Sequence, residues 1–137
     1  MNAVDTNVLV YAQDPRDARK RDIASSLIRE LPDGVLLYQV ACEYIAASRK
    51  LAPFGFSHHE AWNDLRTLRS AWASVLPSWE VHDRAEVIAA THGFSFWDAL
   101  LAAARIQAGV DTLYSEDLGG RPAIDGLNFV DPFAVTV

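Results

Sequence analysis

The sequence predicts an α/β fold in which helices cover a central, mainly parallel sheet. Short apolar runs typical of strands alternate with longer segments of helical periodicity along the 137 residues. The run Val35–Tyr38 is continuous, as expected for a strand that is buried on both faces of a parallel sheet. Half of the residues are hydrophobic and 22% are charged, which is typical of a globular chain. We therefore expect one domain spanning residues 1–137.

In the first half of the chain, apolar spacing and turn residues predict two strands and three helices. A strand at 1–4 is followed by a helix that opens after Asn7. A helix over 18–31, with Ile23, Leu27 and Leu31 on one face, ends at the turn 32–34. A strand at 35–38 and a helix over 39–49 follow, before Pro53 and Gly55 interrupt the pattern.

In the second half, helix caps mark the starts of the elements. Ser57 and Glu60 form a predicted capping box for a long helix that carries Trp62 and Trp72, which we interpret as packing residues rather than nucleobase-stacking ones. Ser95 is the predicted cap of an Ala- and Leu-rich helix. The remaining expected elements are a loop or short strand at 77–81, helices at 83–91 and 96–108, and strands at 112–114 and 127–130.

The composition excludes several classes of protein. A net charge of −6 argues against a general nucleic-acid coat, although it does not exclude a nuclease. We expect the clusters of positive charge at 16–21 and 49–50 to be solvated helix surface. The single cysteine cannot form an internal disulfide, and no zinc-site spacing occurs. We see no signal peptide and no apolar run long enough for a membrane span, so a cytoplasmic protein is the default expectation.

A polar trio, Asp5-Thr6-Asn7, follows the first predicted strand and precedes the apolar residues 8–10. One interpretation is structural, because Asp and Thr are common helix caps. The other is functional, because ligands bind at the carboxyl edge of an open parallel sheet. The trio alone does not separate the two interpretations.

Four carboxylates are expected at that same edge. Asp5 and Asp117 follow strands, while Glu43 and Asp98 lie near the starts of helices and are surrounded by apolar neighbours. Four acids in one crevice repel one another, and burial raises their pKa values. A divalent cation relieves this repulsion, and oxygen-only ligands favour Mg²⁺ or Mn²⁺ over zinc.

These residues together resemble a PIN-domain ribonuclease, and in particular the VapC-type toxins of bacterial type II toxin–antitoxin systems. The resemblance covers essentially the whole chain. It rests on four segments in order, namely Asp5-Thr6-Asn7-Val8-Leu9, Glu43, Phe96-Trp97-Asp98-Ala99-Leu100 and Leu113-Tyr114-Ser115-Glu116-Asp117-Leu118. It implies a PIN-like three-layer α/β/α fold and metal-dependent endonucleolytic cleavage of RNA.

The resemblance also assigns roles to individual residues. Its metal-binding acids match Asp5, Glu43, Asp98 and Asp117, with Asp117 favoured over its neighbour Glu116. Asn7 and Ser115 match polar residues that orient a carboxylate or a water, and Thr6 either does the same or caps the helix. Gly119 stands where some relatives carry a further acid, which implies a weaker second metal. The family further implies a homodimer and an antitoxin partner that blocks the crevice; the apolar helices with Trp62 and Trp72 suit either protein interface. Because no membrane span is expected, we expect no membrane partner.

Three alternatives stay open at this point. A phosphatase of the haloacid dehalogenase type also has an Asp after its first strand, but it needs a second Asp where this chain has Asn7. An inert PIN module would be expected to lack one of the metal acids, and all four are present. A housekeeping RNA-processing nuclease would have the same site chemistry, and an antitoxin-like reading frame upstream of the gene would distinguish it from a toxin.

Overall fold

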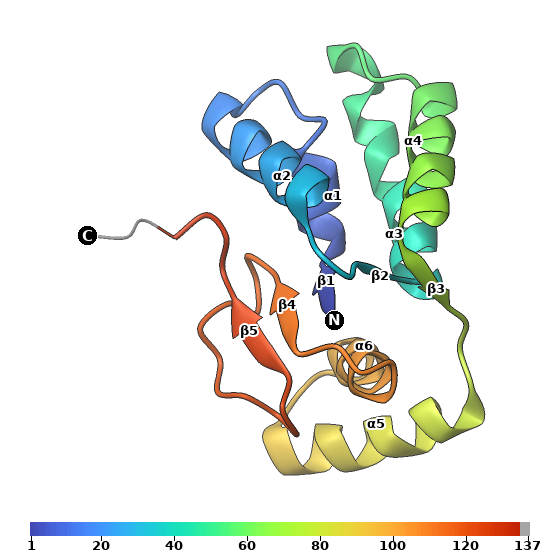
Figure 1. The fold of residues 1–137 in the computed structure, drawn as a ribbon, viewed down its shortest axis with the longest axis vertical. Helices are drawn as coiled ribbons and strands as arrows, with labels where there is room; N and C mark the ends of the chain where they lie inside the picture. Colours follow the sequence, from blue (N-terminus) through green and yellow to red (C-terminus); the bar gives the residue numbers. More distant parts are fainter. Residues whose placement is uncertain (135–137) are drawn as a thin grey trace.

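The computed structural model describes residues 1–134, and it confirms the predicted alternation of strands and helices (Figure 1). In chain order the elements are β1 (Asn2–Val4), α1 (Thr6–Tyr11), α2 (Ala18–Glu30), β2 (Val35–Leu37), α3 (Tyr38–Ser48), the 3₁₀ helix η1 (Arg49–Phe54), α4 (His58–Ala71), β3 (Ala73–Val75), α5 (Trp79–His92), α6 (Phe96–Gln107), β4 (Thr112–Tyr114) and β5 (Asn128–Val130). Within this part of the chain, no single helix is long and apolar enough to cross a membrane; α5 and α6 meet that criterion only as a pair, bent by 119°.

All strand pairs are parallel, as predicted. One ladder has the order β1-β4-β5 and the other pairs β2 with β3. A parallel bridge between Asn2 and Gly34 joins the two ladders, so the strands follow one another across the molecule as β3-β2-β1-β4-β5. The first strand thus occupies the centre of the sheet, and its carboxyl end lies at the middle of the edge where ligands bind in such folds.

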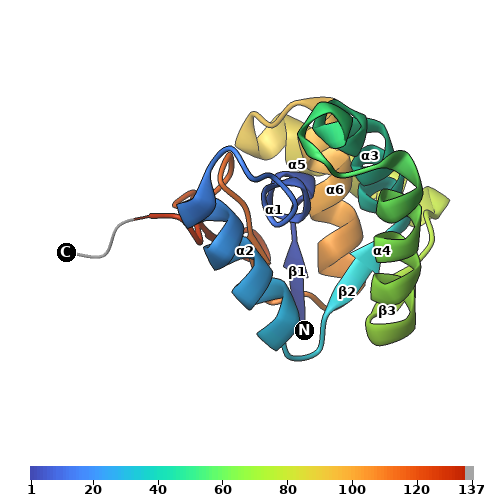
Figure 2. The ribbon, with the colours of Figure 1, turned by 90° about the horizontal axis from the view of Figure 1, so that it is seen from above.

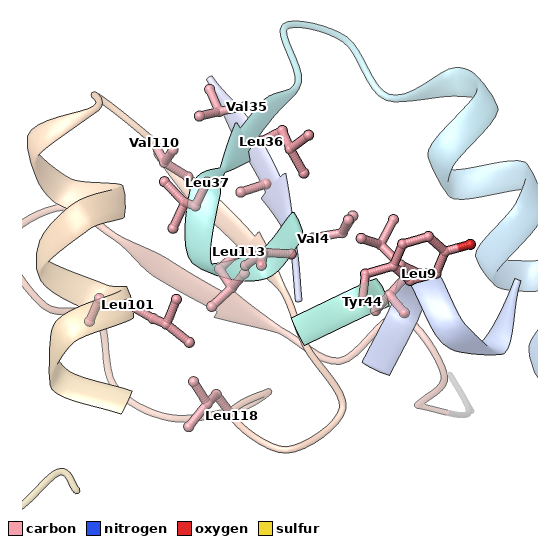
Figure 3. Packing of buried hydrophobic residues seen from close by; sticks show 14 of the residues in the cluster. Val4, Leu9, Val35, Leu36, Leu37, Tyr44, Leu101, Val110, Leu113 and Leu118 are labelled. Carbon is pink, nitrogen blue, oxygen red and sulfur yellow. The ribbon is translucent and has the colours of Figure 1, made fainter. Parts of the chain in front are cut away.

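Helices cover both faces of the sheet. Figures 1 and 2 show α1, α2, α3 and α4 on one side of the strands and α5 with α6 on the other. Leu9 of α1 and Tyr44 of α3 pack against the first face, and Leu101 of α6 lies against the second (Figure 3). The central mainly parallel sheet between two helical layers is therefore the α/β arrangement that the sequence predicts.

The strand β2 is buried on both faces, which confirms the interpretation of its continuous apolar run. Val35, Leu36 and Leu37 are each at most 3% exposed. Tyr38, which was predicted to end this strand, instead begins α3 and is 55% exposed. The strand is therefore one residue shorter than expected, and the aromatic ring faces outward.

The prediction of a loop or short strand at residues 77–81 is confirmed only in part, because Pro77 and Ser78 form a loop and the rest belongs to α5. The strand of this region is β3, which begins one residue after Trp72, where Ala73 donates a hydrogen bond to the carbonyl of Gly34. Ser78 then caps α5 by accepting a hydrogen bond from the Val81 amide at 3.4 Å, so the helix starts four residues earlier than expected.

The predicted helix caps are confirmed. The hydroxyl of Ser57 accepts from the Glu60 amide at 3.1 Å, and that of Ser95 accepts from the Asp98 amide at 3.2 Å. Gly93 closes α5 with a φ of 68°, a left-handed conformation that glycine adopts without steric cost. Because Ser95 fixes the first turn of α6, it also fixes the position of Asp98 in that turn.

The two tryptophans of the α4 region have different environments. Trp72 is 8% exposed and covers Gly34, where an added Cβ would lie 2.6 Å from the indole ring. Trp62 is 41% exposed on the outer face of α4. Trp72 therefore belongs to the core and is not available to an interface, whereas Trp62 is.

Candidate active site

Asp5 lies at the carboxyl end of the central strand and is held from three directions. Its backbone amide donates to the Tyr114 carbonyl at 2.9 Å, which continues the pairing of β1 with β4. One carboxylate oxygen accepts from the Thr6 amide at 2.9 Å and so caps α1. The structural and functional interpretations of this residue are thus compatible, because the capping acid also lies at the ligand-binding edge.

Ser115 supports Asp5 from the neighbouring strand. Its fully buried hydroxyl donates to the second carboxylate oxygen of Asp5 at 2.8 Å and accepts from the Leu118 amide at 3.2 Å. The parallel register, which places Val4 beside Tyr114, brings the two side chains together. Ser115 therefore fixes both the orientation of Asp5 and the turn that follows β4.

A buried arginine completes the surroundings of Asp5, and sequence reasoning missed it. Arg105 of α6 is 0% exposed, and its Nη2 lies 3.4 Å from the Asp5 carboxylate. Its Nε and Nη1 atoms are buried without a hydrogen-bond partner among the described residues. Burial lowers the pKa of this guanidinium, whereas the charges of Asp5, Glu43 and Asp98 raise it.

The sequence does carry a signal for Arg105. It follows Asp98 by seven residues, or two helical turns, in a helix whose other buried residues are Ala and Leu. A charged residue on the same helical face as an acid, inside an apolar stretch, needs a partner.

Glu43 and Asp98 lie near Arg105, on α3 and α6. Glu43 is half-buried in the second turn of α3, and its Oε1 is buried without a hydrogen-bond partner in the described structure. Burial raises the pKa of Glu43, the charges of Asp5 and Asp98 raise it further, and Arg105 opposes them. Three carboxylates from three elements thus share one electrostatic environment around a single guanidinium.

Asp117 is linked to the same edge through Asn7. The Asn7 amide nitrogen donates to the Asp117 carboxylate at 3.2 Å, and its Oδ1 is buried without a partner in residues 1–134. Asp117 itself is exposed. Asn7 is therefore placed between the acid of β1 and the acid that follows β4.

Glu116 points to a different set of partners. Its carboxylate pairs with Lys20 at 2.5 Å and accepts from the Tyr11 hydroxyl at 2.9 Å. Lys20 holds the pKa of Glu116 below its usual range. Because the Glu116 carboxylate is bonded to Tyr11 of α1 and Lys20 of α2, Asp117 is the acid of this pair that remains available at the sheet edge.

The donor set fits a divalent cation, although the side chains are not gathered around one point. Among the described residues, no three Asp, Glu, His or Cys side chains lie close enough together to hold an ion. The available atoms are carboxylate and amide oxygens, which suit Mg²⁺ or Mn²⁺, and two of them, Glu43 Oε1 and Asn7 Oδ1, are buried and unpaired. Buried oxygens of this kind are expected to have a partner, and a cation would supply it.

Gly119 is required by packing. A Cβ at this position would lie 2.5 Å from the backbone nitrogen of Asp131, so no side chain fits without moving the chain after β5. The further acid that the resemblance implies for this position is therefore sterically excluded. Its space is filled by Asp131, whose Oδ1 accepts a hydrogen bond from the Phe133 amide at 2.8 Å.

Most of the positive charges predicted at 16–21, before and on the first turn of α2, are paired within the protein. Arg16 contacts Asp14 at 2.8 Å, Lys20 contacts Glu116 and Arg21 lies 3.6 Å from Asp22, while Arg19 donates to the Phe133 carbonyl. These contacts leave little uncompensated charge at 16–21. Arg49 and Lys50, on η1, are exposed.

Comparisons with known proteins agree with this architecture. A chain in a structure of a toxin–antitoxin complex from Klebsiella pneumoniae is similar with a TM-score of 0.72 and 16% identity, over 98% of this chain and 100% of that chain. VapC20 of Mycobacterium tuberculosis, a sarcin–ricin loop cleaving toxin, is similar with a TM-score of 0.65 and 19% identity, over 84% and 88% of the two chains. No match was found among curated proteins.

The family comparison covers the site itself. The model of the PIN domain matches residues 3–119, a range that begins before Asp5 and ends after Asp117. It therefore includes the strand ends and helix starts that carry the four carboxylates, together with Arg105. Because this match extends over most of the sequence and the sheet and helices have the corresponding arrangement, the chain belongs to the PIN domain family.

Proposed function

We propose that this protein is a Mg²⁺- or Mn²⁺-dependent endoribonuclease that acts as the toxin of a type II toxin–antitoxin pair. The observation that carries the proposal is the buried ion pair of Arg105 with Asp5 at the carboxyl edge of the sheet, where the charges of Glu43 and Asp98 also act on the guanidinium. Partly buried acids that lie near one another lower the stability of the fold through repulsion and desolvation. A divalent cation would relieve that repulsion and could bind a phosphodiester.

In this proposal the chain positions the reactants and the cation supplies the chemistry. Asp5, Glu43, Asp98 and Asp117 would hold the ion, Ser115 orients Asp5, and Asn7 orients Asp117. A bound Mg²⁺ or Mn²⁺ supplies positive charge that activates water and stabilises the phosphoryl group. Hydrolysis then adds the water oxygen to phosphorus and breaks one ester bond of the RNA.

The similar structures support RNA as the substrate and an antitoxin as a partner. VapC20 is described as cleaving the sarcin–ricin loop, and the Klebsiella pneumoniae chain belongs to a toxin–antitoxin complex. The same site would serve a housekeeping RNA-processing nuclease, which stays the alternative. A cytoplasmic location follows from either role and is part of the proposal.

An exposed apolar face supports a homodimer. Tyr38, Leu76, Trp79 and Trp97, which we call the apolar face, line a groove of about 550 Å³ between α3, the segment after β3, α5 and α6. Trp79 is 81% exposed, Leu76 72% and Trp97 63%. Contiguous exposed apolar surface usually marks a protein interface, and a second copy of the chain is the occupant that we propose.

Cleavage of RNA by the purified chain tests the proposed activity. We expect cleavage with Mg²⁺ or Mn²⁺ and none with excess EDTA. Asp98→Asn should reduce the rate by more than the roughly 100-fold that loss of an outer partner of a metal ligand costs. Asp98 is the best acid to change, because no hydrogen bond joins its carboxylate to the described structure, whereas Asp5 also caps α1.

Asp83→Asn is the matched control, since Asp83 is an exposed acid on α5 and its loss changes the net charge equally. It should retain full activity. Undiminished cleavage in EDTA, or equal activity of Asp98→Asn and the parent, would contradict the proposal.

The toxin role is tested by inducing the same three proteins in bacteria. Growth arrest by the parent and Asp83→Asn alone supports a toxin, and active enzyme without arrest supports the housekeeping alternative.

A further inference from the structure

Arg105 is the most unusual buried group in the described structure. Its side chain is completely buried, yet one hydrogen bond, 3.4 Å long, is the only one that connects the guanidinium to another described residue. A guanidinium has five N–H donors and stays charged in proteins, so burial with so few partners is costly. The surrounding acids must therefore compensate its charge.

We propose that Arg105 acts as a fixed internal cation of the carboxylate site and thereby limits the site to one divalent ion. The inference rests on the proposed divalent-ion site, and it concerns how many ions that site holds and how tightly. Arg105 is a positioning residue here, because it lies behind Asp5 and is not accessible to a substrate.

The charges around Arg105 support a single ion. Asp5, Glu43 and Asp98 contribute three negative charges around Arg105, and the guanidinium offsets one of them. Asp117, the fourth proposed ligand, is exposed and bonded to Asn7, and it lies outside this group. One divalent ion neutralises the charge left around Arg105, and a second would make that group positively charged.

The geometry gives Arg105 two opposite effects. Without a cation it reduces repulsion between the acids, so the metal-free protein can keep them partly buried. When a cation binds, the guanidinium repels it through a medium of low dielectric constant, where a nearby like charge matters more than at the surface. Removing the charge should therefore weaken the metal-free fold and strengthen cation binding.

Titration of the metal-free protein with Mn²⁺, followed by calorimetry at pH 8, tests the proposal. The parent should bind one ion per chain. Arg105→Met, which keeps an unbranched apolar side chain, should bind Mn²⁺ at least tenfold more tightly or bind a second ion. Its melting temperature should be lower than that of the parent without Mn²⁺ and should rise more on addition of Mn²⁺. Arg105→Lys should resemble the parent in affinity and stoichiometry.

Two further variants keep the test decisive. Arg84→Met removes an exposed charge on α5 and should leave Mn²⁺ binding unchanged. Arg105→Met combined with Glu43→Gln removes one charge of each sign, so this double variant should melt at a higher temperature than Arg105→Met, even if Arg105→Met folds only with Mn²⁺. Two ions bound to the parent, unchanged or weaker binding by Arg105→Met, or no rescue in the double variant would overturn the inference. None of these measurements uses RNA, so a failure here is distinct from absence of ribonuclease activity.

Discussion

At the scale of single residues, the acids of the site differ in how firmly they are held. Both carboxylate oxygens of Asp5 accept hydrogen bonds, whereas Oε1 of Glu43 has no partner among the described residues. The firmly held acid lies on the central strand, and the unpaired one lies on a helix beside it. A cation would therefore meet one rigid ligand and others that can adjust their rotamers.

Ser115→Ala should lower the free energy of unfolding by about 1–3 kcal/mol, because it leaves the buried Leu118 amide and one Asp5 oxygen without a partner. Chemical denaturation at neutral pH measures the change. Ser70→Ala is the control, since Ser70 is exposed and bonds only to its own helix, and its effect should stay within about 0.5 kcal/mol. Equal effects of the two substitutions would show that the Ser115 hydroxyl has no special structural role.

The resemblance to PIN domains, and not the strand pattern, assigned Asn7 and Ser115 to orienting a carboxylate or a water. In the structure Asn7 donates a hydrogen bond to Asp117 and Ser115 donates one to Asp5. Arg105 was missed because helical periodicity shows only that a residue shares a face with Asp98. Whether that face turns toward the sheet depends on how α6 packs, which is a tertiary property.

At the scale of elements, a cation–π contact of Arg16 joins the segment between α1 and α2 to η1. Asp14 is buried and accepts from both the backbone amide and the guanidinium of Arg16, whose guanidinium also lies 4.5 Å from the ring centre of Phe54. The hydrogen bonds from Arg16 lower the pKa of Asp14, although burial opposes them.

The lowered pKa of Asp14 fixes the sign of a pH effect. A carboxyl whose pKa is lower in the folded protein stabilises the fold above its unfolded pKa, and that contribution is lost as the pH falls through the folded value. Asp14→Asn should therefore cost about 1–3 kcal/mol at pH 7, a cost that shrinks below about pH 4. Urea unfolding at several pH values measures it. Asp22→Asn removes the exposed partner of Arg21 and should have an effect within about 0.5 kcal/mol at each pH.

The element that sequence reasoning misplaced is β3. Its residues Ala73 and Ser74 are exposed and only Val75 is partly buried, so no apolar alternation marks a strand there. The strand exists because its backbone pairs with β2, which is buried and strongly apolar. The strands with apolar cores, β2 and β4, were predictable for the opposite reason, because their side chains alone indicate burial.

At the scale of the whole molecule, the proposed catalytic edge and the apolar face both use α3 and α6. Glu43 and Asp98 belong to the proposed site, while Tyr38 and Trp97 on the same two helices line the groove. An interface at the apolar face would therefore contact both helices that carry these acids. Dimer formation would therefore make the two helices that carry Glu43 and Asp98 more rigid.

Trp79→Glu should convert a dimer of the 15.1 kDa chain into a monomer, because it places a charge at the centre of the apolar face. Trp79 is 81% exposed, so its change should leave the fold intact. Sedimentation velocity across a range of concentrations measures the result. Val87→Glu is the control, since Val87 is 63% exposed on the same helix and does not line the groove. A monomeric parent, or dissociation by Val87→Glu alone, would contradict the proposed interface.

The parallel pairing of β1 with β4 has a consequence for the chain as it is synthesised. Asn2 through Val4 are synthesised long before their partners Thr112 through Tyr114. The supports of Asp5 come equally late, because Arg105 and Ser115 follow it by 100 and 110 residues. A nascent chain can form α2, α3 and α4 from local contacts, yet it cannot assemble the edge that bears the acids until Ser115 has been made. If the protein is a toxin, the ribosome has therefore made most of the described residues before the RNA-cleaving site around Asp5 can form.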